Sequence, residues 1–227
     1  MDFLNGEVLL IDKELTWTSF DVVNALRNSI LRKLKLKKIK VGHAGTLDPL
    51  ATGLLIICTG KKTREIDQFQ AEDKTYTGVI TLGGKRPSYD LETEIVETYD
   101  YSQITESQIA EAVRKLTGEI DQTPPMFSAI KVDGVRAYDA ARDNQKLELK
   151  SRRVTIHQFI IHKVEMPNIH FEIKCSKGTY IRSIARDLGL ELKNGAYLSE
   201  LRRTAIGDYK VDDALRVEEA RLLINEA

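Results

Sequence analysis

Cysteine is scarce in this 227-residue chain, and long apolar runs are missing. The two cysteines, Cys58 and Cys175, lie far apart in apolar stretches. This excludes a disulfide-rich scaffold and predicts buried thiols in a reducing compartment. No apolar run approaches the roughly 20 residues of a membrane span, and the N-terminus lacks a signal-peptide pattern. We therefore expect a cytoplasmic protein that does not contact a membrane.

Sequence patterns for metals and nucleotide cofactors are also missing. The four histidines show no H-x-x-x-H or Cys/His spacing, and no P-loop or G-x-G-x-x-G follows an expected strand. We therefore expect neither a metal nor a cofactor. The composition is that of an ordinary globular protein, 42% hydrophobic and 30% charged. Its length suits one large α/β domain or two small ones.

The chain has no net charge, because 34 basic and 34 acidic residues cancel. The balance counts mildly against a nucleic-acid-binding protein, but the charges are unevenly distributed. Six basic residues crowd a short segment: Arg32, Lys33, Lys35, Lys37, Lys38 and Lys40. They are equally well interpreted as a patch that contacts RNA phosphates or as the solvated face of an amphipathic segment.

Hydrophobic patterning predicts strands and helices that do not alternate strictly. We expect strands at residues 7–11, 54–58, 76–82, 95–97, 154–164 and 169–175. Thr18 with Asp21 resembles a capping box opening a helix that ends near Leu34, and Thr105 caps another that runs to Leu116. A third helix is expected at residues 180–190. These elements predict one domain of mixed α/β class.

The most informative segment is residues 42–53, which read GHAGTLDPLATG and carry a single carboxylate, Asp48. The glycines allow close approach of a ligand to the backbone, and Pro49 biases Asp48 toward an extended conformation. This pattern places a lone acid, without metal-ligand partners nearby in the sequence, where a ligand can approach the backbone closely. An alternative is that Asp48 only caps a helix whose first residue is Pro49.

Residues 42–53 resemble the catalytic loop of the TruB-type tRNA pseudouridine synthases, in which the aspartate is the catalytic residue. Four later segments resemble motifs of the same family in the same order. They are residues 73–76 (DKTY), 124–131 (PPMFSAIK, continued by 135–138), 175–182 (CSKGTYIR) and 195–204 (GAYLSELRRT). The likeness spans nearly all of the chain and indicates a tRNA pseudouridine-55 synthase in a short form without a C-terminal PUA-type domain.

The resemblance implies a pseudouridine synthase fold of α+β class. Its features are a mainly antiparallel mixed sheet, flanking helices and a central RNA-binding cleft. A single catalytic domain would cover residues 1–227, and an insertion at about 124–153 would grip an RNA stem-loop.

The resemblance also implies a catalytic group made of Asp48, Tyr180 and Arg182. Asp48 would supply the catalytic carboxylate, Arg182 would lie beside it, and Tyr180 would pack near the uracil and assist proton removal at C5. From the residues alone, Tyr180 could be a packing residue and Arg182 a surface arginine. A tyrosine with an ordinary pKa of about 10 needs activation to act as a base.

Four further residues are implied to bind the substrate. Tyr76 would stack on the extruded base, His43 would enter the RNA loop and fill the gap, Leu201 would line the uracil pocket and Asp90 would contact the RNA. From the residues alone, Tyr76 is an ordinary strand aromatic and Leu201 a core leucine.

Two segments depart from the family pattern. Residues 86–93, RPSYDLET, lack the threonines before Asp90 and the glycine after it. Residues 13–19, KELTWTS, replace the family's K-P-x-G-x-T-S, which we interpret as a turn change distant from the chemistry.

The implied activity is isomerisation of a uridine in the T-arm loop of tRNA, at position 55, to pseudouridine. The glycosidic bond breaks, the base rotates and C5 joins C1′, so no redox change or cofactor is required. The base must first be flipped out, at a cost of a few kcal/mol. Attack of the carboxylate at C1′, attack at C6 and proton abstraction at C2′ all stay open.

Two other functions also stay open: a non-catalytic RNA-binding or RNA-folding module on the same scaffold, and a related synthase acting on another RNA. The expected partner is tRNA. No protein partner is implied, so we expect a monomer.

Overall fold

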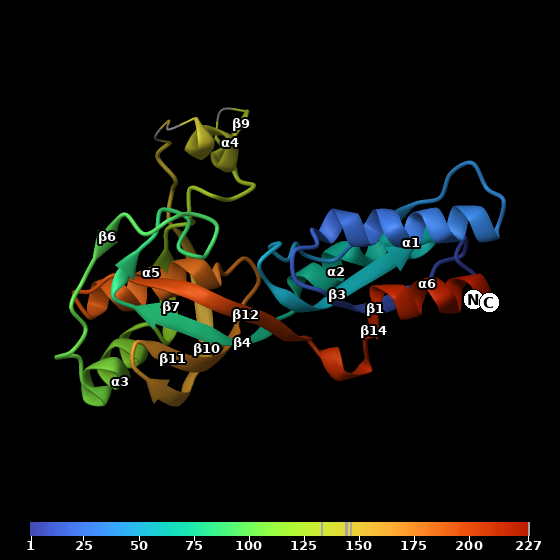
Figure 1. Ribbon diagram of the computed structural model, residues 1–227. Helices are drawn as coiled ribbons and strands as arrows, with labels where there is room; N and C mark the ends of the chain where they lie inside the picture. The colour runs from blue at the N-terminus through green and yellow to red at the C-terminus, as the bar shows by residue number, and fades with distance from the viewer. Residues whose placement is uncertain (133, 144, 146, 227) are drawn as a thin grey trace. The chain divides into compact units, whose positions relative to one another are not determined.

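The chain divides into two compact units in the computed structural model, which describes residues 1–132, 134–143, 145 and 147–226 (Figure 1). Unit 1 contains Met1–Tyr76 and Leu201–Ala227, and unit 2 contains Thr77–Glu200. Strands β4 (Lys74–Leu82) and β12 (Ala196–Ile206) each contribute residues to both units. The expectation of one catalytic domain over the whole chain stays a prediction.

The sheet of unit 1 is built around β3, whose sequence TGLLIICT is almost entirely apolar. Its strand order is β14 (Leu215–Arg216), β1 (Val8–Lys13), β3 (Thr52–Thr59) and β12, with β2 (Val41–His43) on β3 and β13 (Tyr209–Lys210) on β12. β3 is antiparallel to β1 and parallel to β12. A strand that is apolar at every position is typical of a sheet covered on both faces.

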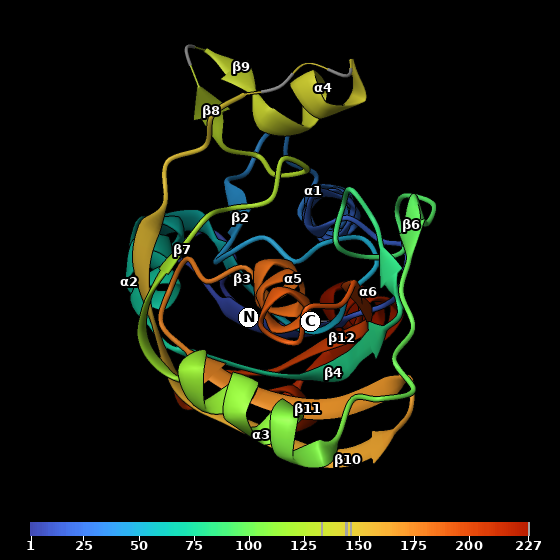
Figure 2. The same ribbon diagram turned by 90° about the vertical axis from the view of Figure 1, so that its left-hand side faces the viewer.

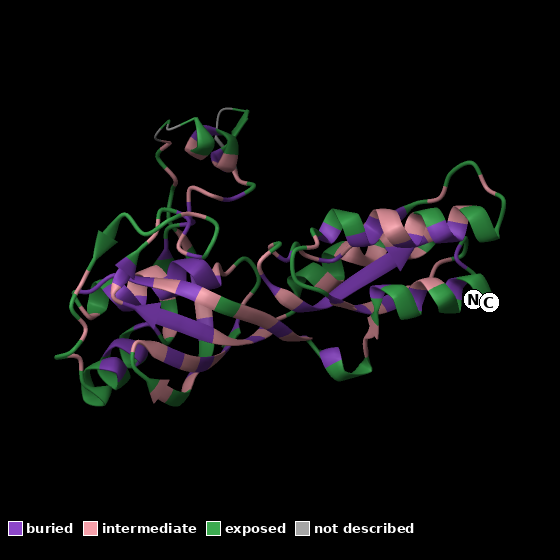
Figure 3. Ribbon diagram, viewed as in Figure 1, coloured by how far each residue is buried: buried purple, intermediate pink, exposed green. Residues whose placement is uncertain are grey.

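Successive side chains of β3 enter two separate hydrophobic clusters, as the two-residue period of a strand requires. Leu55 and Ile57 pack with α1 (Ser19–Lys33) and α6 (Val217–Glu226). Leu54, Ile56 and Cys58 pack on the other face with residues of β12 and of α2 (Ile66–Ala71). Figure 3 shows β3 buried along almost its whole length. Two short 3₁₀ turns, Gly60–Glu65 and Val211–Asp213, complete the unit.

Helix α1 begins where the sequence predicts it to begin. The Thr18 hydroxyl accepts a hydrogen bond from the Asp21 N–H, and the Asp21 side chain accepts one from the Thr18 N–H, so the capping box is confirmed. Arg32 and Lys33 occupy the last turn, where positive charge complements the helix dipole. The helix is therefore fixed at both ends by local interactions.

Unit 2 holds a second group of strands, in the order β12, β4, β11, β10, β7 (Figure 2). β10 (Arg152–Glu165) and β11 (Asn168–Cys175) form an antiparallel hairpin, and β7 (Gly118–Gln122) pairs with β10. α3 (Glu106–Lys115) contacts β10 and α5 (Ile181–Glu191). The short strands β5 (Gly84–Lys85) and β6 (Glu97–Thr98) form a separate pair.

The expected RNA-gripping insertion at 124–153 forms a small lobe that projects from the sheet of unit 2 (Figures 1 and 2). It contains the pair β8 (Lys131–Val132) and β9 (Val135–Arg136), followed by α4 (Ala137–Arg142). Residues 133, 144 and 146 of the insertion lie outside the described residues. Its role in gripping RNA stays a prediction.

The predicted fold class is confirmed: the protein is α+β, with a mixed, mostly antiparallel set of strands and flanking helices. Most predicted elements are present within two residues of the expected ends, but the strand expected at 95–97 forms only at Glu97–Thr98. Cys58 and Cys175 are both buried, and no disulfide joins them. No helix among the described residues has the length and apolar character needed to cross a membrane.

The turn after β1 contains an unusual backbone conformation at Thr16. Its φ is 72°, in the left-handed region that β-branched residues rarely adopt. The family pattern has glycine at this position, which avoids the penalty because glycine has no Cβ. The Thr16 N–H donates to the carbonyl of Pro49 at 2.8 Å, so the conformation is maintained by a contact with the Asp48 loop.

Thr16→Gly is expected to stabilise the protein by about 0.5–1 kcal/mol. A non-glycine residue in this region costs about 1–2 kcal/mol, and the greater backbone freedom of unfolded glycine offsets part of the gain. Urea unfolding of the variant and the wild type measures the difference. Thr16→Ala is the control because it retains Cβ, and an equal gain in both variants would show that strain at Thr16 is not the cause.

Candidate active site

The Asp48 loop is a turn that leads into β3. The Ala51 N–H donates to the Asp48 carbonyl at 3.0 Å, and the Asp48 side chain is half-buried. No helix begins at Pro49, so the alternative that Asp48 is only a helix cap is wrong. The carboxylate therefore belongs to a loop that turns tightly between Asp48 and Ala51, directly before β3.

Ser19 anchors the residue before Asp48. Its hydroxyl accepts a hydrogen bond from the Leu47 N–H at 2.8 Å and donates to the Leu47 carbonyl at 3.1 Å. Ser19 is the first residue of α1, and both it and Leu47 are buried. One hydroxyl thus satisfies both backbone groups of Leu47, which would otherwise be buried without partners.

Arg203 anchors the loop from β12. Its side chain is only 1% exposed, and its guanidinium donates to the carbonyls of Leu54 at 2.8 Å, Gly45 at 3.2 Å and Thr46 at 3.3 Å. A buried charge is tolerated only with such compensation. The planar fork of arginine reaches three carbonyls at once, so Arg203 ties the glycine-rich loop to β3.

Lys13 lies at the end of β1, is 0% exposed and donates to the carbonyls of Glu14 at 2.9 Å and Trp17 at 2.7 Å. Burial lowers its pKa to about 8, against an opposing attraction from Asp48 and with a further lowering by Arg203. The interpretation of residues 13–19 as a turn distant from the chemistry is wrong. This turn supplies Lys13, Thr16 and Ser19, all of which interact with the Asp48 loop.

Three predicted substrate-binding residues also belong to unit 1. His43 ends β2 and is half-buried. Burial lowers its pKa, and the charge of Arg203 lowers it further, against a backbone hydrogen bond with Gly45, so the site favours the neutral imidazole. Tyr76 in β4 is 8% exposed, and Leu201 in β12 is half-buried. The RNA contacts expected of all three stay predictions.

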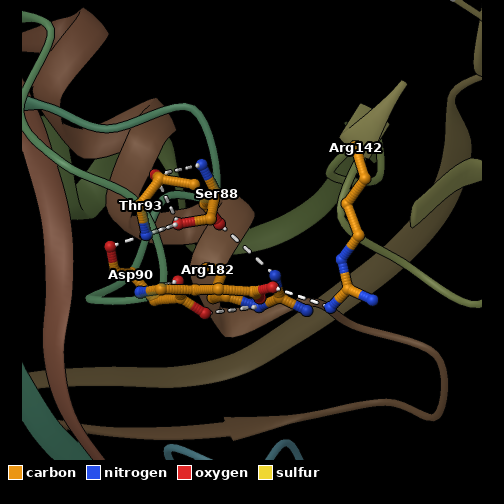
Figure 4. Close-up of polar contacts among 6 residues, drawn as sticks. Ser88, Asp90, Thr93, Arg142 and Arg182 are labelled. Atoms are coloured by element: carbon orange, nitrogen blue, oxygen red, sulfur yellow. Dashed lines mark hydrogen bonds and ion pairs between the residues drawn. The ribbon is translucent and has the colours of Figure 1, made fainter. Parts of the chain in front are cut away.

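The other predicted site residues belong to unit 2, where Arg182 and Asp90 are brought together (Figure 4). Arg182 Nε lies 3.5 Å from Asp90 Oδ2, and an Arg182 terminal nitrogen donates to the Ser88 carbonyl at 3.3 Å. The two residues are 5% and 6% exposed. The alternative of a surface arginine at position 182 is therefore wrong.

The divergent loop that carries Asp90 is stabilised by its own hydroxyl groups. The Ser88 and Thr93 hydroxyls lie 2.9 Å apart, and each accepts a hydrogen bond from the other residue's N–H. The Glu92 N–H donates to Asp90 at 2.9 Å, and Glu92 itself pairs with Arg142 of α4 at 3.1 Å (Figure 4). The Asp90 carboxylate thus points into the protein, toward Arg182.

Tyr180 is the residue before α5, which begins one residue later than the sequence predicts, and its backbone is held by Gln122. The Gln122 side chain accepts a hydrogen bond from the Tyr180 N–H at 2.8 Å and donates to the Tyr180 carbonyl at 3.2 Å. Gln122 is fully buried. The guanidinium carbon of Arg152 lies 4.7 Å from the centre of the Tyr180 ring, a cation–π arrangement.

The seven predicted residues are thus divided between the units, with His43, Asp48, Tyr76 and Leu201 in unit 1. Asp90, Tyr180 and Arg182 belong to unit 2. The expected pairing of Asp48 with Arg182 stays a prediction. Among the described residues, no three histidine, cysteine, aspartate or glutamate side chains come together in a group that could hold a metal.

Sequence reasoning did not single out Lys13, Ser19, Gln122 or Arg203. All four are polar residues that are fully or almost fully buried. Ser19, Gln122 and Arg203 are hydrogen-bonded to the backbone of segments that carry candidate residues, whereas Lys13 donates to the carbonyls of its own turn. Arg203 lies within the motif at residues 195–204, but nothing in the sequence indicates that it is buried while its neighbour Arg202 is half-exposed. That side chain makes an ion pair with Asp12 at 2.7 Å.

Comparison with known sequences identifies the family. Residues 32–181 match the TruB family pseudouridylate synthase N-terminal domain. The chain belongs to the TruB family of pseudouridylate synthases. Residues 182–224 match the tRNA pseudouridylate synthase B C-terminal domain.

Relatives and solved structures agree with this family. The chain is 54% identical over 217 residues to a tRNA pseudouridine synthase B of Flavobacterium johnsoniae, covering 95% of each chain. It is 52% identical to one of Phocaeicola vulgatus, covering 96% of this chain and 93% of the relative. A chain in the crystal structure of a Cbf5–Nop10–Gar1 complex matches with a TM-score of 0.70 and 28% identity over 95% of this chain. This chain spans about half (53%) of that longer one.

Arg203→Lys is expected to destabilise the protein by about 2–4 kcal/mol and to lower kcat more than it raises KM. Lysine keeps the charge but cannot reach three carbonyls, and each buried carbonyl left without a partner costs about 1–3 kcal/mol. Urea unfolding and steady-state kinetics measure both effects. The matched control is Arg202→Lys, which alters a half-exposed ion pair expected to contribute at most about 1 kcal/mol. Equal effects of the two substitutions would contradict the anchoring role of Arg203.

The lowered pKa of Lys13 predicts a pH-dependent contribution to stability. Between about pH 8 and pH 10.5 the folded lysine has lost its proton while the unfolded one retains it. The unfolded state then binds more protons, so the Lys13 contribution to stability rises with pH across this window and is constant below it. The difference in unfolding free energy between the wild type and Lys13→Met, measured in urea from pH 7 to pH 10, isolates this effect. A difference that is flat or falls with pH would refute the assignment.

Proposed function

We propose that this protein isomerises a uridine in the T-arm loop of tRNA, at position 55, to pseudouridine, with Asp48 as the catalytic carboxylate. One observation carries the proposal: a half-buried carboxylate stands in a loop that Ser19 and Arg203 hold by its main chain. Membership of the TruB family, and relatives named tRNA pseudouridine synthase B, support the reaction and the class of substrate.

The reaction needs one ionised carboxylate and no co-reactant. The C1′–N1 bond breaks, the base rotates and a C1′–C5 bond forms, while C5 loses a proton and N1 gains one. A carboxylate can act as a nucleophile or as a base in such a sequence. Lys13, buried at the end of β1, interacts electrostatically with Asp48, and this attraction raises the pKa of Lys13 against the lowering caused by burial.

The remaining residues would bind the flipped nucleotide. Tyr76 would stack on the uracil, which is worth roughly 1–3 kcal/mol per base, and the neutral imidazole of His43 would occupy the gap in the RNA loop. Leu201 would line the uracil pocket, and Tyr180 would assist proton removal from C5. Arg182, oriented by Asp90, would stabilise the charge of Asp48 during the reaction.

The expected contact of Asp90 with RNA needs a refinement within this scheme. Its carboxylate is buried and directed at Arg182. We therefore propose that Asp90 affects the substrate through Arg182. A tRNA substrate places the protein in the cytoplasm, and we retain the expectation of a monomer.

Asp48→Asn is expected to lower kcat by about 10⁴-fold or more, as the loss of an essential catalytic group does in other enzymes. RNA binding should change little because only the ionisable oxygen is replaced. Tritium release from tRNA labelled at uracil C5 measures turnover, and filter binding measures affinity. Asp208→Asn, in an exposed turn of unit 1, is the control with the same chemical change.

Near wild-type turnover by Asp48→Asn would disprove the catalytic assignment. Mass-spectrometric mapping of treated tRNA transcripts tests the substrate independently. Pseudouridine at another position, or only in another RNA, would replace the proposed target without removing the activity.

A further inference from the structure

A long stretch of unit 1 contains no acidic residue at all. Between Asp21 and Asp48 there are 26 residues, and seven of them are basic. Six of the seven fall within residues 32–40, and we call these six the basic strip: Arg32, Lys33, Lys35, Lys37, Lys38 and Lys40. This concentration stands out because the chain as a whole has no net charge.

The basic strip has a defined conformation at the C-terminal end of α1. The Leu36 N–H donates to the Leu31 carbonyl at 3.0 Å, and the Gly60 N–H donates to the Lys40 carbonyl at 2.9 Å. Ile39 packs against the cluster of α1, α6 and β3, and Leu36 is half-buried. All six basic residues are exposed. In Figure 3 most of the loop after α1 has the colour of exposed residues. The apolar residues thus anchor the segment, and the basic residues face solvent.

The positive charge of the strip is not neutralised within unit 1. Lys33 donates to the carbonyl of Asn225 at 2.7 Å, which leaves its charge unpaired. None of the lysines at 35, 37, 38 and 40 forms an ion pair with another of the described residues. On the neighbouring helix α6, Glu218 pairs with Arg221 at 2.7 Å, and Glu219 accepts a hydrogen bond from the backbone of Arg216. A surface of this kind attracts polyanions.

Helix α1 sets the distance between the basic strip and the Asp48 loop. Its first residue, Ser19, is hydrogen-bonded to Leu47, and its last residue, Lys33, belongs to the strip. The 15 residues of the helix rise about 22 Å at 1.5 Å per residue. The strip is too far from Asp48 to contact the target nucleotide.

We propose that the basic strip binds phosphates of the tRNA outside the T-arm loop, one helix length from the reacting uridine. This inference rests on the proposed function, which supplies the RNA. An anionic membrane is the other polyanion to consider, but membrane-binding basic segments expose apolar residues beside their charges. Here Ile39 packs against the hydrophobic cluster and Leu36 is half-buried, so Leu34 is the one exposed apolar residue of residues 32–40. The strip therefore fits a phosphate backbone better than a lipid surface.

The test uses a variant in which four lysines of the strip are all replaced by glutamine: Lys35, Lys37, Lys38 and Lys40. Its binding is measured to two RNAs. One is whole tRNA, and the other is a T-arm stem-loop trimmed to the loop and its closing base pairs. Each phosphate contact contributes about 0.7–0.9 to the slope of log K against log salt concentration. The variant is expected to lose about 3 from this slope for whole tRNA and to bind it at least about tenfold more weakly. Affinity for the trimmed RNA and kcat at saturating tRNA should stay at wild-type values.

The matched control removes four positive charges that already have acidic partners, by Lys62→Gln, Arg114→Gln, Lys115→Gln and Lys163→Gln. If the control weakens tRNA binding as much as the strip variant, net charge explains the effect and the proposal fails. It also fails if the strip variant binds tRNA normally, loses affinity for both RNAs equally, or loses binding only to phosphatidylserine vesicles. A wild-type protein that forms no pseudouridine refutes the proposed function, a result distinct from all of these.

Discussion

The buried guanidinium of Arg203 is the interaction on which the candidate active site most depends. A charged group that is 1% exposed must be compensated by hydrogen bonds, and here the acceptors are three main-chain carbonyls. Two of them belong to the Asp48 loop and the third to β3. The constraint acts in both directions: the loop carbonyls accept the hydrogen bonds of the Arg203 guanidinium, and the guanidinium holds the loop backbone in its conformation. Gly53 completes this arrangement, because it pairs with Arg203 in the parallel register of β3 and β12. Its φ is 106°, and a Cβ there would collide with the Arg203 carbonyl oxygen.

Burial also sets the charge states around the loop. It lowers the pKa of Lys13 to about 8, and it lowers the pKa of His43, which favours the neutral imidazole. The charge of Arg203 acts in the same direction on both residues. Asp48 opposes this effect at Lys13. The two buried cations beside the loop, Lys13 and Arg203, are thus both hydrogen-bonded to backbone carbonyls.

The sequence predicted best the features that local chemistry determines. The capping box at Thr18, the apolar strand β3 and the hairpin of β10 and β11 each follow from short-range patterns, and each is present. The loop around Asp48 was found because its glycines and proline are close together in the sequence. The anchoring residues were not found, because Ser19, Gln122 and Arg203 act on segments far along the chain. Whether a polar side chain is buried depends on the tertiary structure, and the periodicity of hydrophobic residues in the sequence does not show it. The turn at residues 13–19 was misjudged for the same reason, since its contact with Pro49 spans 33 positions.

The way in which the Asp48 loop is held has a consequence for how such an enzyme can diverge. Ser19, Thr16 and Arg203 bind only main-chain atoms of Leu47, Pro49, Gly45 and Thr46. The anchoring therefore does not depend on the side chain at position 46, which is exposed. Substitution at position 46 can therefore leave the backbone of the loop unchanged. The main chain of Thr46 thus belongs to the scaffold of the loop, while its side chain is free of that constraint.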